Sequence, residues 1–249
     1  MNNYTDKNIW IIGASSGIGR ALAVELSRRG ATLALSARSE GKLQSLNEEL
    51  GGGHIVLPFD VSNTYSYEQA AQELERKFTR IDSTLFLAAL YSPNSLEAMD
   101  IDEAKAMVDV NLNGALNTIH CVLPILKKQK GGQLALCGSV AGYRGLPNGQ
   151  PYSATKAAVI NLAESLKAEH SEFDIKVINP GFVRTPLTDK NDFKMPMMIE
   201  PEQAAGIIAK ELLTSRFEIH FPKGFTFFLK FIALLPSRLY FKIAPKTQL

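Results

Sequence analysis

A serine, a tyrosine and a lysine near the middle of the chain have a spacing that suits proton transfer to a carbonyl oxygen. Twelve residues separate Ser139 from Tyr152, and three separate Tyr152 from Lys156. Tyrosine and lysine at positions i and i+4 of a helix share one face. A free phenol has a pKa of about 10, and a neighbouring ammonium favours the phenolate and lowers that pKa. The pattern therefore predicts that Lys156 tunes Tyr152 as the proton donor for carbonyl reduction.

A glycine-rich stretch follows the first apolar run of the chain. It reads Gly13-Ala14-Ser15-Ser16-Gly17-Ile18-Gly19-Arg20. Such a turn lets backbone approach a pyrophosphate, and the helix start offers N–H donors and the positive end of its dipole. A tight strand-to-helix connection without a ligand is the alternative, but the position near the N-terminus favours a dinucleotide site. The candidate contacts are Gly13, Ser15, Ser16, Gly17, Ile18, Gly19 and Arg20.

Short apolar runs alternate with amphipathic segments, which predicts strands alternating with helices. The predicted strands are Ile9–Ile12, Thr32–Ser36, Ile55–Leu57, Thr84–Ala88, Gln133–Cys137, Ile175–Ile178 and Glu218–Phe221. The predicted helices are Ile18–Arg29, Glu40–Leu50, Tyr65–Phe78, Ile101–Lys128, Ser153–His170 and Glu202–Leu213. This alternation predicts a parallel sheet, because parallel strands need a crossover. We expect a doubly wound, Rossmann-type α/β/α single domain whose motifs meet at the carboxyl edge of the sheet.

The glycine pattern and the Ser-Tyr-Lys spacing together resemble the short-chain dehydrogenase/reductase family. Its Gly-x-x-x-Gly-x-Gly motif is matched by Gly13, Gly17 and Gly19, and the resemblance runs from about Ile9 to Thr185. It implies an oxidoreductase with a nicotinamide cofactor, in which Ser139 orients the substrate oxygen and Lys156 also holds the nicotinamide ribose. It further implies that Asn111 anchors a water near the lysine. Further cofactor contacts implied are Asp60, Val61, Ala89, Pro180, Gly181, Val183 and Thr185, beside Tyr152 and Lys156.

Two segments of the chain depart from the family pattern. Ile12 stands where the family usually has threonine before the first glycine. The family's Asn-Asn-Ala-Gly after the fourth strand is Leu87-Ala88-Ala89-Leu90 here, and only Ala89 matches. The small residues still let the backbone approach the adenine ribose, but the polar link that the missing asparagine makes is lost.

The end of the second strand indicates which nicotinamide cofactor fits. An acidic residue there binds the ribose 2′-hydroxyl of NAD, whereas an arginine accommodates the 2′-phosphate of NADP. Ala37 stands where the family commonly has an aspartate, and Arg38 follows it. Arg38 and Arg20 would give a phosphate charge-assisted hydrogen bonds, which predicts NADP(H). The alternative is that both arginines are solvated surface residues.

Composition narrows the class of protein further. The formal net charge is +2 over 249 residues, which argues against a nucleic-acid partner. Neither Cys121 nor Cys137 belongs to a metal-ligand pattern, so no metal is expected. The N-terminus does not look like a signal peptide, and no run of 18 uncharged apolar residues predicts a membrane span. We expect a cytoplasmic homodimer or homotetramer.

The last segment, 223–249, forms an apolar and basic arm beyond the predicted catalytic domain at 1–222. Residues 223–243 include six Phe or Tyr residues, and no acidic residue follows Glu218. Aromatic residues with cationic flanks are typical of an interfacial helix, which Pro236 would divide into two pieces. The arm could pack on its own domain, join a partner subunit or lie on a membrane surface, which would make the protein peripheral.

These observations predict an NADP(H)-dependent enzyme that interconverts a carbonyl and an alcohol on a fairly apolar substrate. Examples are a 3-oxoacyl group, a steroid or retinoid-like molecule, and an aliphatic ketone or aldehyde. A lid at Leu187–Ile199, which carries Phe193, Met195, Met197 and Met198, would cover the substrate, unless these side chains only pack the loop. A non-catalytic NADP(H)-binding regulator and a membrane-associated scaffold are the alternatives. A binding protein has no need of a tuned tyrosine, which argues against the regulator.

Overall fold

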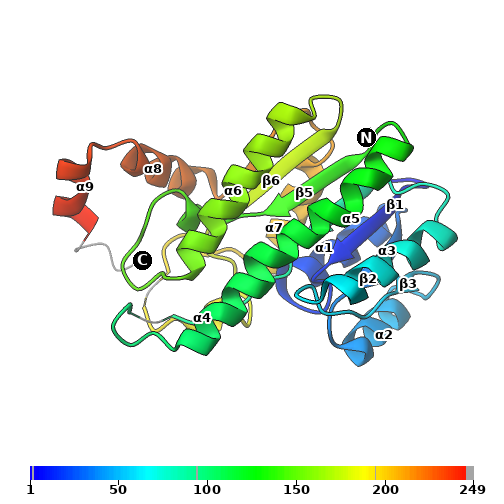
Figure 1. Ribbon diagram of the computed structural model, residues 1–249, viewed down its shortest axis with the longest axis horizontal. Coiled ribbons are helices and arrows are strands. Elements are labelled where there is room, and N and C mark those ends of the chain that lie inside the picture. Colours follow the sequence, from blue (N-terminus) through cyan, green and yellow to red (C-terminus); the bar gives the residue numbers. More distant parts are fainter. Residues whose placement is uncertain (2, 94, 194, 245–249) are drawn as a thin grey trace.

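One parallel sheet organises the molecule (Figure 1). The computed structural model describes residues 1, 3–93, 95–193 and 195–244. In this part of the chain the strand order is β3-β2-β1-β4-β5-β6-β7. The strands are β1 (Asn8–Ile12), β2 (Thr32–Ser36), β3 (Ile55–Val56), β4 (Ser83–Phe86), β5 (Gln133–Cys137), β6 (Asp174–Pro180) and β7 (Glu218–Phe221). The winding direction reverses between β1 and β4, and this reversal opens a crevice for a ligand at the carboxyl ends of the strands.

Helices connect successive strands and cover both faces of the sheet. They are α1 (Gly17–Arg28), α2 (Glu40–Glu49), α3 (Thr64–Lys77), α4 (Ile101–Val108), α5 (Gly114–Lys128), α6 (Tyr152–Glu169), α7 (Pro201–Glu211), α8 (Lys223–Ala233) and α9 (Ser237–Ile243). Three short helical turns are η1 (Asp109–Asn113), η2 (Val140–Gly142) and η3 (Thr188–Lys190). The predicted doubly wound, three-layer fold is confirmed.

Two apolar cores lie on opposite faces of the sheet. Strand side chains alternate between the faces, so Trp10 and Ile12 join the core under α3, α5 and α6. Ile9 and Ile11 join the core under α1, α2 and α7. All four side chains are fully buried, as expected for a strand covered on both faces.

Element boundaries differ from the prediction in two places that matter for the crevice. The fourth strand ends at Phe86 rather than Ala88, so the next residues are free to line the crevice. The single helix predicted over Ile101–Lys128 is α4 and α5 joined by the π-helical turn η1. Such turns occur frequently at functional sites, and this one contains Asn111.

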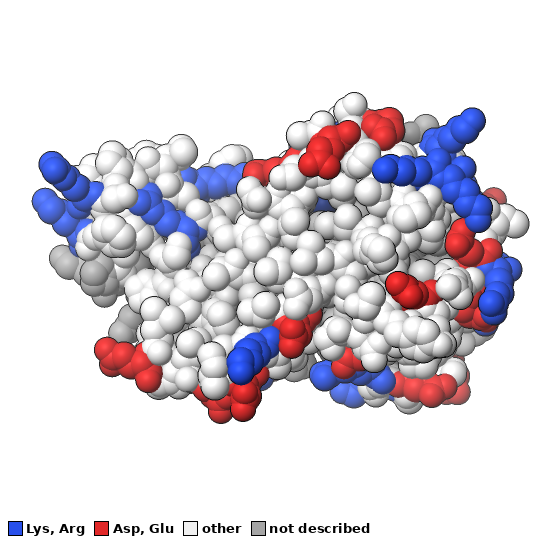
Figure 2. Space-filling view, viewed as in Figure 1, with Lys and Arg blue, Asp and Glu red and all other residues white. Residues whose placement is uncertain are grey.

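The C-terminal arm packs on its own domain as two helices. Pro236 lies between α8 and α9, as its inability to continue a helix predicts. In Figure 2 the end of the molecule formed by these helices shows Lys and Arg atoms on an otherwise uncharged surface. Residues 245–249 of the predicted arm lie outside the described residues. Of the described helices, none is long and apolar enough to cross a membrane.

Candidate active site

The glycine loop is shaped by close contacts between backbone segments. Gly13 has φ +98°, and a Cβ atom placed on it would lie 2.6 Å from the backbone nitrogen of Ala88. A Cβ on Gly19 would lie 2.1 Å from the carbonyl oxygen of Gly13. Gly17 has φ +53°, a conformation that favours glycine. Any side chain at Gly13 or Gly19 would therefore push the start of α1 or the loop after β4 out of place.

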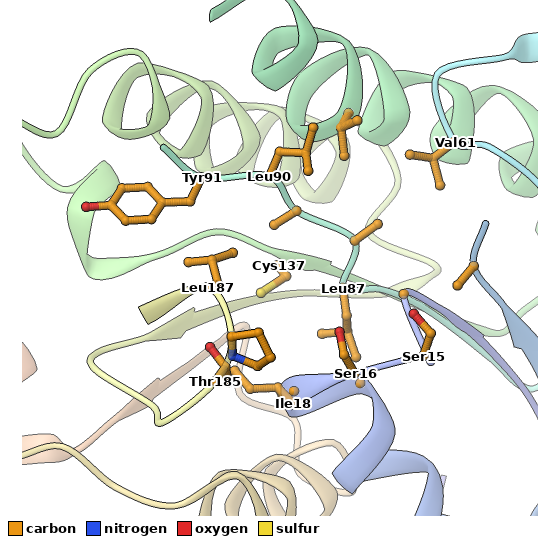
Figure 3. Close-up of a pocket in the computed structure, with 18 of the residues that line it drawn as sticks. Ser15, Ser16, Ile18, Val61, Leu87, Leu90, Tyr91, Cys137, Thr185 and Leu187 are labelled. Atoms are coloured by element: carbon orange, nitrogen blue, oxygen red, sulfur yellow. The ribbon is translucent and has the colours of Figure 1, made fainter. Parts of the chain in front are cut away.

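A cavity of about 780 Å³ opens at the carboxyl edge of the sheet, beside this loop. Figure 3 shows side chains of the glycine loop, the loop after β4 and the segment after β6 facing a common space. Nearly all predicted site residues line it: Gly13, Ser15, Ser16, Gly17, Ile18, Gly19, Arg38, Asp60, Val61, Ala89, Ser139, Tyr152, Lys156, Pro180, Gly181, Val183 and Thr185. The fold thus brings together segments that are far apart in the sequence. Arg20 and Asn111 are the predicted residues that are not on this wall.

The Ser139 loop and α6 form one wall of the cavity. A Cβ on Gly142 would lie 2.7 Å from the backbone carbon of Lys156, so η2 packs directly on α6. Ser139 Oγ accepts a hydrogen bond from the backbone N–H of Ala141 at 3.1 Å. Lys156 is only 1% exposed, and its Nζ donates to the Cys137 carbonyl oxygen at 2.8 Å. Its Nζ lies 5.6 Å from the centre of the Tyr152 ring, and Tyr152 hydrogen-bonds with Ser139, so these three of the predicted catalytic residues are neighbours.

Burial controls the protonation of this wall. Burial raises the pKa of Tyr152, and a hydrogen bond with Ser139 lowers it by less. Burial also lowers the pKa of Lys156. The predicted direction for the tyrosine was wrong, because burial disfavours the phenolate and Lys156 is not among the groups that shift the pKa of Tyr152. Tyr152 is accordingly a neutral phenol near neutral pH, which is the form that can donate a proton.

Asn111 supports the cavity without lining it. Its Oδ1 accepts from the Leu90 N–H at 2.7 Å, and its Nδ2 donates to the Leu90 carbonyl oxygen at 2.9 Å. Nδ2 also lies 3.1 Å from Thr155 Oγ1 on α6. The buried Asn111 side chain therefore ties the loop after β4 to the helix that carries Tyr152 and Lys156. This is the loop in which the family's Asn-Asn-Ala-Gly is absent.

The two predicted phosphate arginines have different surroundings. Arg38 lines the cavity, whereas the Arg20 guanidinium forms an ion pair with Glu49 of α2. Lys42, in the first turn of α2, also lines the cavity and was missed from the sequence. A weak signal was present, because cations are disfavoured at the start of a helix. Asp60 accepts a hydrogen bond from Ser62, while the Asn63 side chain caps α3.

Tyr91 is a second cavity residue that sequence reasoning missed. Its ring meets the Tyr152 ring edge to face, with centroids 5.0 Å apart. Its hydroxyl donates to Asn191 Oδ1 at 2.7 Å, and Lys190 Nζ donates to its carbonyl oxygen at 2.8 Å. The segment after β6 is thereby tied across the cavity to the loop after β4. The only available signal was the position of Tyr91 just beyond the end of a parallel strand.

The predicted lid contributes different residues from those expected. Leu187, Thr188 and Lys190 line the cavity. Phe193 instead packs on Phe182, with ring centroids 5.9 Å apart. Met197 is 56% exposed. Phe193 thus packs the loop, which was the alternative interpretation, and Met197 faces outward.

Comparisons with known proteins agree with this geometry. The chain matches the short chain dehydrogenase family over residues 7–195. A Myxococcus xanthus protein named only as an uncharacterized oxidoreductase is 31% identical over 96% of this chain and 97% of its own length. This chain therefore belongs to the short-chain dehydrogenase family of oxidoreductases.

Solved structures show the same architecture. An alcohol dehydrogenase from the archaeon Thermococcus sibiricus, complexed with 5-hydroxy-NADP, is 29% identical with a TM-score of 0.77; the match covers 86% of this chain and 95% of that one. A short chain dehydrogenase/reductase from Burkholderia phymatum, in complex with NAD, is 22% identical with a TM-score of 0.84. That match covers 92% of this chain and 94% of the other. The second likeness is one of fold alone.

Proposed function

We propose that the protein is an NADP(H)-dependent enzyme that interconverts a carbonyl and an alcohol on a fairly apolar substrate. The observation that carries the proposal is the shared cavity, with the glycine loop on one side and Ser139, Tyr152 and Lys156 on the other. When bound, a nicotinamide cofactor supplies the hydride for reduction or accepts it in oxidation. The cytoplasmic location and the homodimer or homotetramer remain predictions.

The residues present fit such a cofactor. Gly13 and Gly19 let backbone segments pack closely enough to form the loop, and the α1 N-terminus follows it at the cavity wall. Backbone N–H groups at that terminus would bind the pyrophosphate. Asp60 and Ala89 would border the adenosine portion, and the segment from Pro180 to Thr185 would border the nicotinamide.

Tyr152 would donate the proton in reduction. Burial raises its pKa, so it stays protonated until a developing alkoxide needs its proton. Ser139 would orient the substrate oxygen by a hydrogen bond, within reach of the same hydroxyl. Lys156, held by the Cys137 carbonyl oxygen, would bind the nicotinamide ribose and favour the phenolate after transfer.

Two cations support the choice of NADP(H). Arg38 and Lys42 line the cavity at the end of β2, and Ala37 stands where an aspartate would favour NAD. The Thermococcus sibiricus relative carries an NADP analogue, which agrees with this choice. Arg20 would contribute only if it left Glu49. An apolar substrate is favoured by Leu90, Tyr91 and Leu187 on the wall near Tyr152.

Cofactor binding and turnover test the proposal separately. Titration should show tighter binding of NADPH than of NADH. NADPH oxidation would then be followed against ketones, aldehydes, 3-oxoacyl thioesters and steroids of increasing apolar size. Equal affinities, or tighter NADH, would contradict the cofactor choice, and NADPH binding without turnover on any class would favour the regulator.

A further inference from the structure

Helix α8 of the arm has two apolar faces, one packed on the domain and one exposed. One face is docked: Phe225 and Leu229 pack with Val140 and join the partly buried Phe182. The docked position is reinforced by Arg144. It donates to the Ala233 carbonyl oxygen at 2.8 Å, near the end of α8, and stacks 3.9 Å above the ring of Tyr240 in α9.

The opposite face of the arm is apolar and exposed. Phe227, Phe231 and Leu234 are 59%, 64% and 84% exposed, and Phe228 lies beside them. Positions i, i+1, i+4 and i+7 form a single stripe along a helix. Leu239, Phe241 and Ile243 are further exposed apolar residues on α9. We call these seven residues the arm surface. Elsewhere in the described chain, the exposed large apolar side chains are mostly isolated from one another in the sequence.

The charges around the arm surface have one sign. Lys223, Arg238 and Lys242 are exposed on α8 and α9, and the chain has no acidic residue after Glu218. Glu218 itself forms an ion pair with Lys230. Figure 2 shows the result as blue atoms around an uncharged surface at the α8–α9 end. Within the described residues, Lys223, Arg238 and Lys242 form no ion pair.

The arm surface could contact a second copy of the chain or a lipid bilayer, and its charges favour one of these two partners. A two-fold contact between copies of the arm surface would bring the cations of one copy against those of the other. An anionic lipid surface instead offers acyl chains to the aromatic stripe and negative headgroups to the cations. We propose that the arm surface is a peripheral membrane-docking site for anionic bilayers.

The arm also contacts the predicted lid of the cavity, so membrane docking would place the cavity near the bilayer. Phe182 packs on Phe225 of α8, with ring centroids 5.5 Å apart, and also contacts Phe193 of the predicted lid edge to face. Val140, in the same apolar cluster, directly follows Ser139. A docked protein would meet an apolar substrate where it is concentrated, in the bilayer. This last consequence rests on the proposed function, whereas docking itself can be measured without cofactor or substrate.

Co-sedimentation of the full chain with vesicles tests the proposal. The full chain should bind phosphatidylcholine vesicles that contain phosphatidylserine, bind pure phosphatidylcholine much more weakly, and be released by salt. Phe227→Ser/Phe231→Ser should lower the partition coefficient at least about ten-fold. Lys223→Glu/Arg238→Glu/Lys242→Glu should do the same on anionic vesicles only.

Matched controls separate docking from general effects. Tyr65→Ser/Leu116→Ser removes two exposed apolar side chains elsewhere, and Lys105→Glu/Lys127→Glu/Lys210→Glu makes the same change in net charge. Both controls should bind as the unaltered protein does, and thermal unfolding should show every variant folded. Absence of binding by the full chain, or unchanged binding by both arm variants, would overturn the proposal. So would a dimer in sedimentation velocity that Phe227→Ser/Phe231→Ser dissociates while vesicle binding persists, because the arm surface would then join two copies.

Discussion

The cavity and the C-terminal arm are held in place by different kinds of contact. Around the cavity, side-chain ties such as those of Asn111 are joined by contacts of backbone against backbone, as where a Cβ on Gly19 would meet the Gly13 carbonyl oxygen. The arm is held by side chains, such as Arg144 on the α8 carbonyls and His220 on Thr226. Where backbone meets backbone, no side chain can change rotamer to make room for a substitution. A side-chain contact, in contrast, can be lost without moving the backbone. Damage to the arm should therefore leave the cofactor site intact.

The largest expected effect is chemical and confined to the cavity. Tyr152→Phe removes the proton donor and little volume, so we expect kcat to fall by about 10³-fold. NADPH affinity should change by less than about two-fold, because the ring remains. Steady-state kinetics and a fluorescence titration measure the two. Full turnover by Tyr152→Phe would show that the proton comes from another group.

Backbone contact around the cavity is tested by Gly19→Ala. The new methyl cannot avoid the Gly13 carbonyl oxygen, so we expect a loss of about 3 kcal/mol in the free energy of unfolding. NADPH affinity should also fall, because the α1 N-terminus moves. The control is Gly206→Ala in α7, where a Cβ has no neighbour within 4 Å. It should be neutral or stabilising by about 1 kcal/mol in chemical denaturation. Equal effects of the two changes would refute the idea that this contact is rigid.

Cofactor choice gives a smaller expected effect on the same wall. Arg38→Asp should reduce the preference for NADPH over NADH by about 30-fold, since a charge-assisted hydrogen bond is replaced by repulsion. Arg20→Ala should change it little, because Arg20 is paired with Glu49. Binding titrations with both cofactors measure this. If Arg20→Ala has the larger effect, Arg20 leaves Glu49 to bind the phosphate.

The arm should respond to acid before the cavity does. Burial, aided by the charges of Lys230 and Lys223, lowers the pKa of His220 to about 4 from its ordinary value of 6.5. Between these values the unfolded chain binds more protons, so stability falls as the pH falls through this window. The expected loss is at most about 3 kcal/mol, since one pKa unit corresponds to about 1.4 kcal/mol. Because His220 Nδ1 lies 2.5 Å from Thr226 Oγ1 of α8, the loss should be felt in arm docking.

Thermal unfolding of His220→Asn beside the unaltered chain measures this contribution. The variant should lack most of the pH dependence between about pH 4 and 6.5. NADPH affinity of the unaltered chain should stay nearly constant over the milder part of that range. If NADPH affinity falls over the same pH range as stability, the cavity and the arm do not respond separately to acid.

The sequence by itself determined the features that depend on neighbours along the chain. Strand and helix periodicity gave the doubly wound fold, the glycines gave the loop, and Pro236 gave the division of the arm. The positions of Ser139, Tyr152 and Lys156 also followed, because the strand end and the helix start that carry them meet at one sheet edge.

Only the tertiary structure decided which side chains face the cavity and in what state. Arg20 is paired with a residue 29 positions away, and Tyr91 is hydrogen-bonded to one 100 positions away. Periodicity cannot report such partners, because they come from other elements. The raised pKa of Tyr152 likewise results from burial by several segments, which sequence spacing to Lys156 could not reveal. The exposed face of the arm was decided in the same way, by the domain surface that covers the other face of α8.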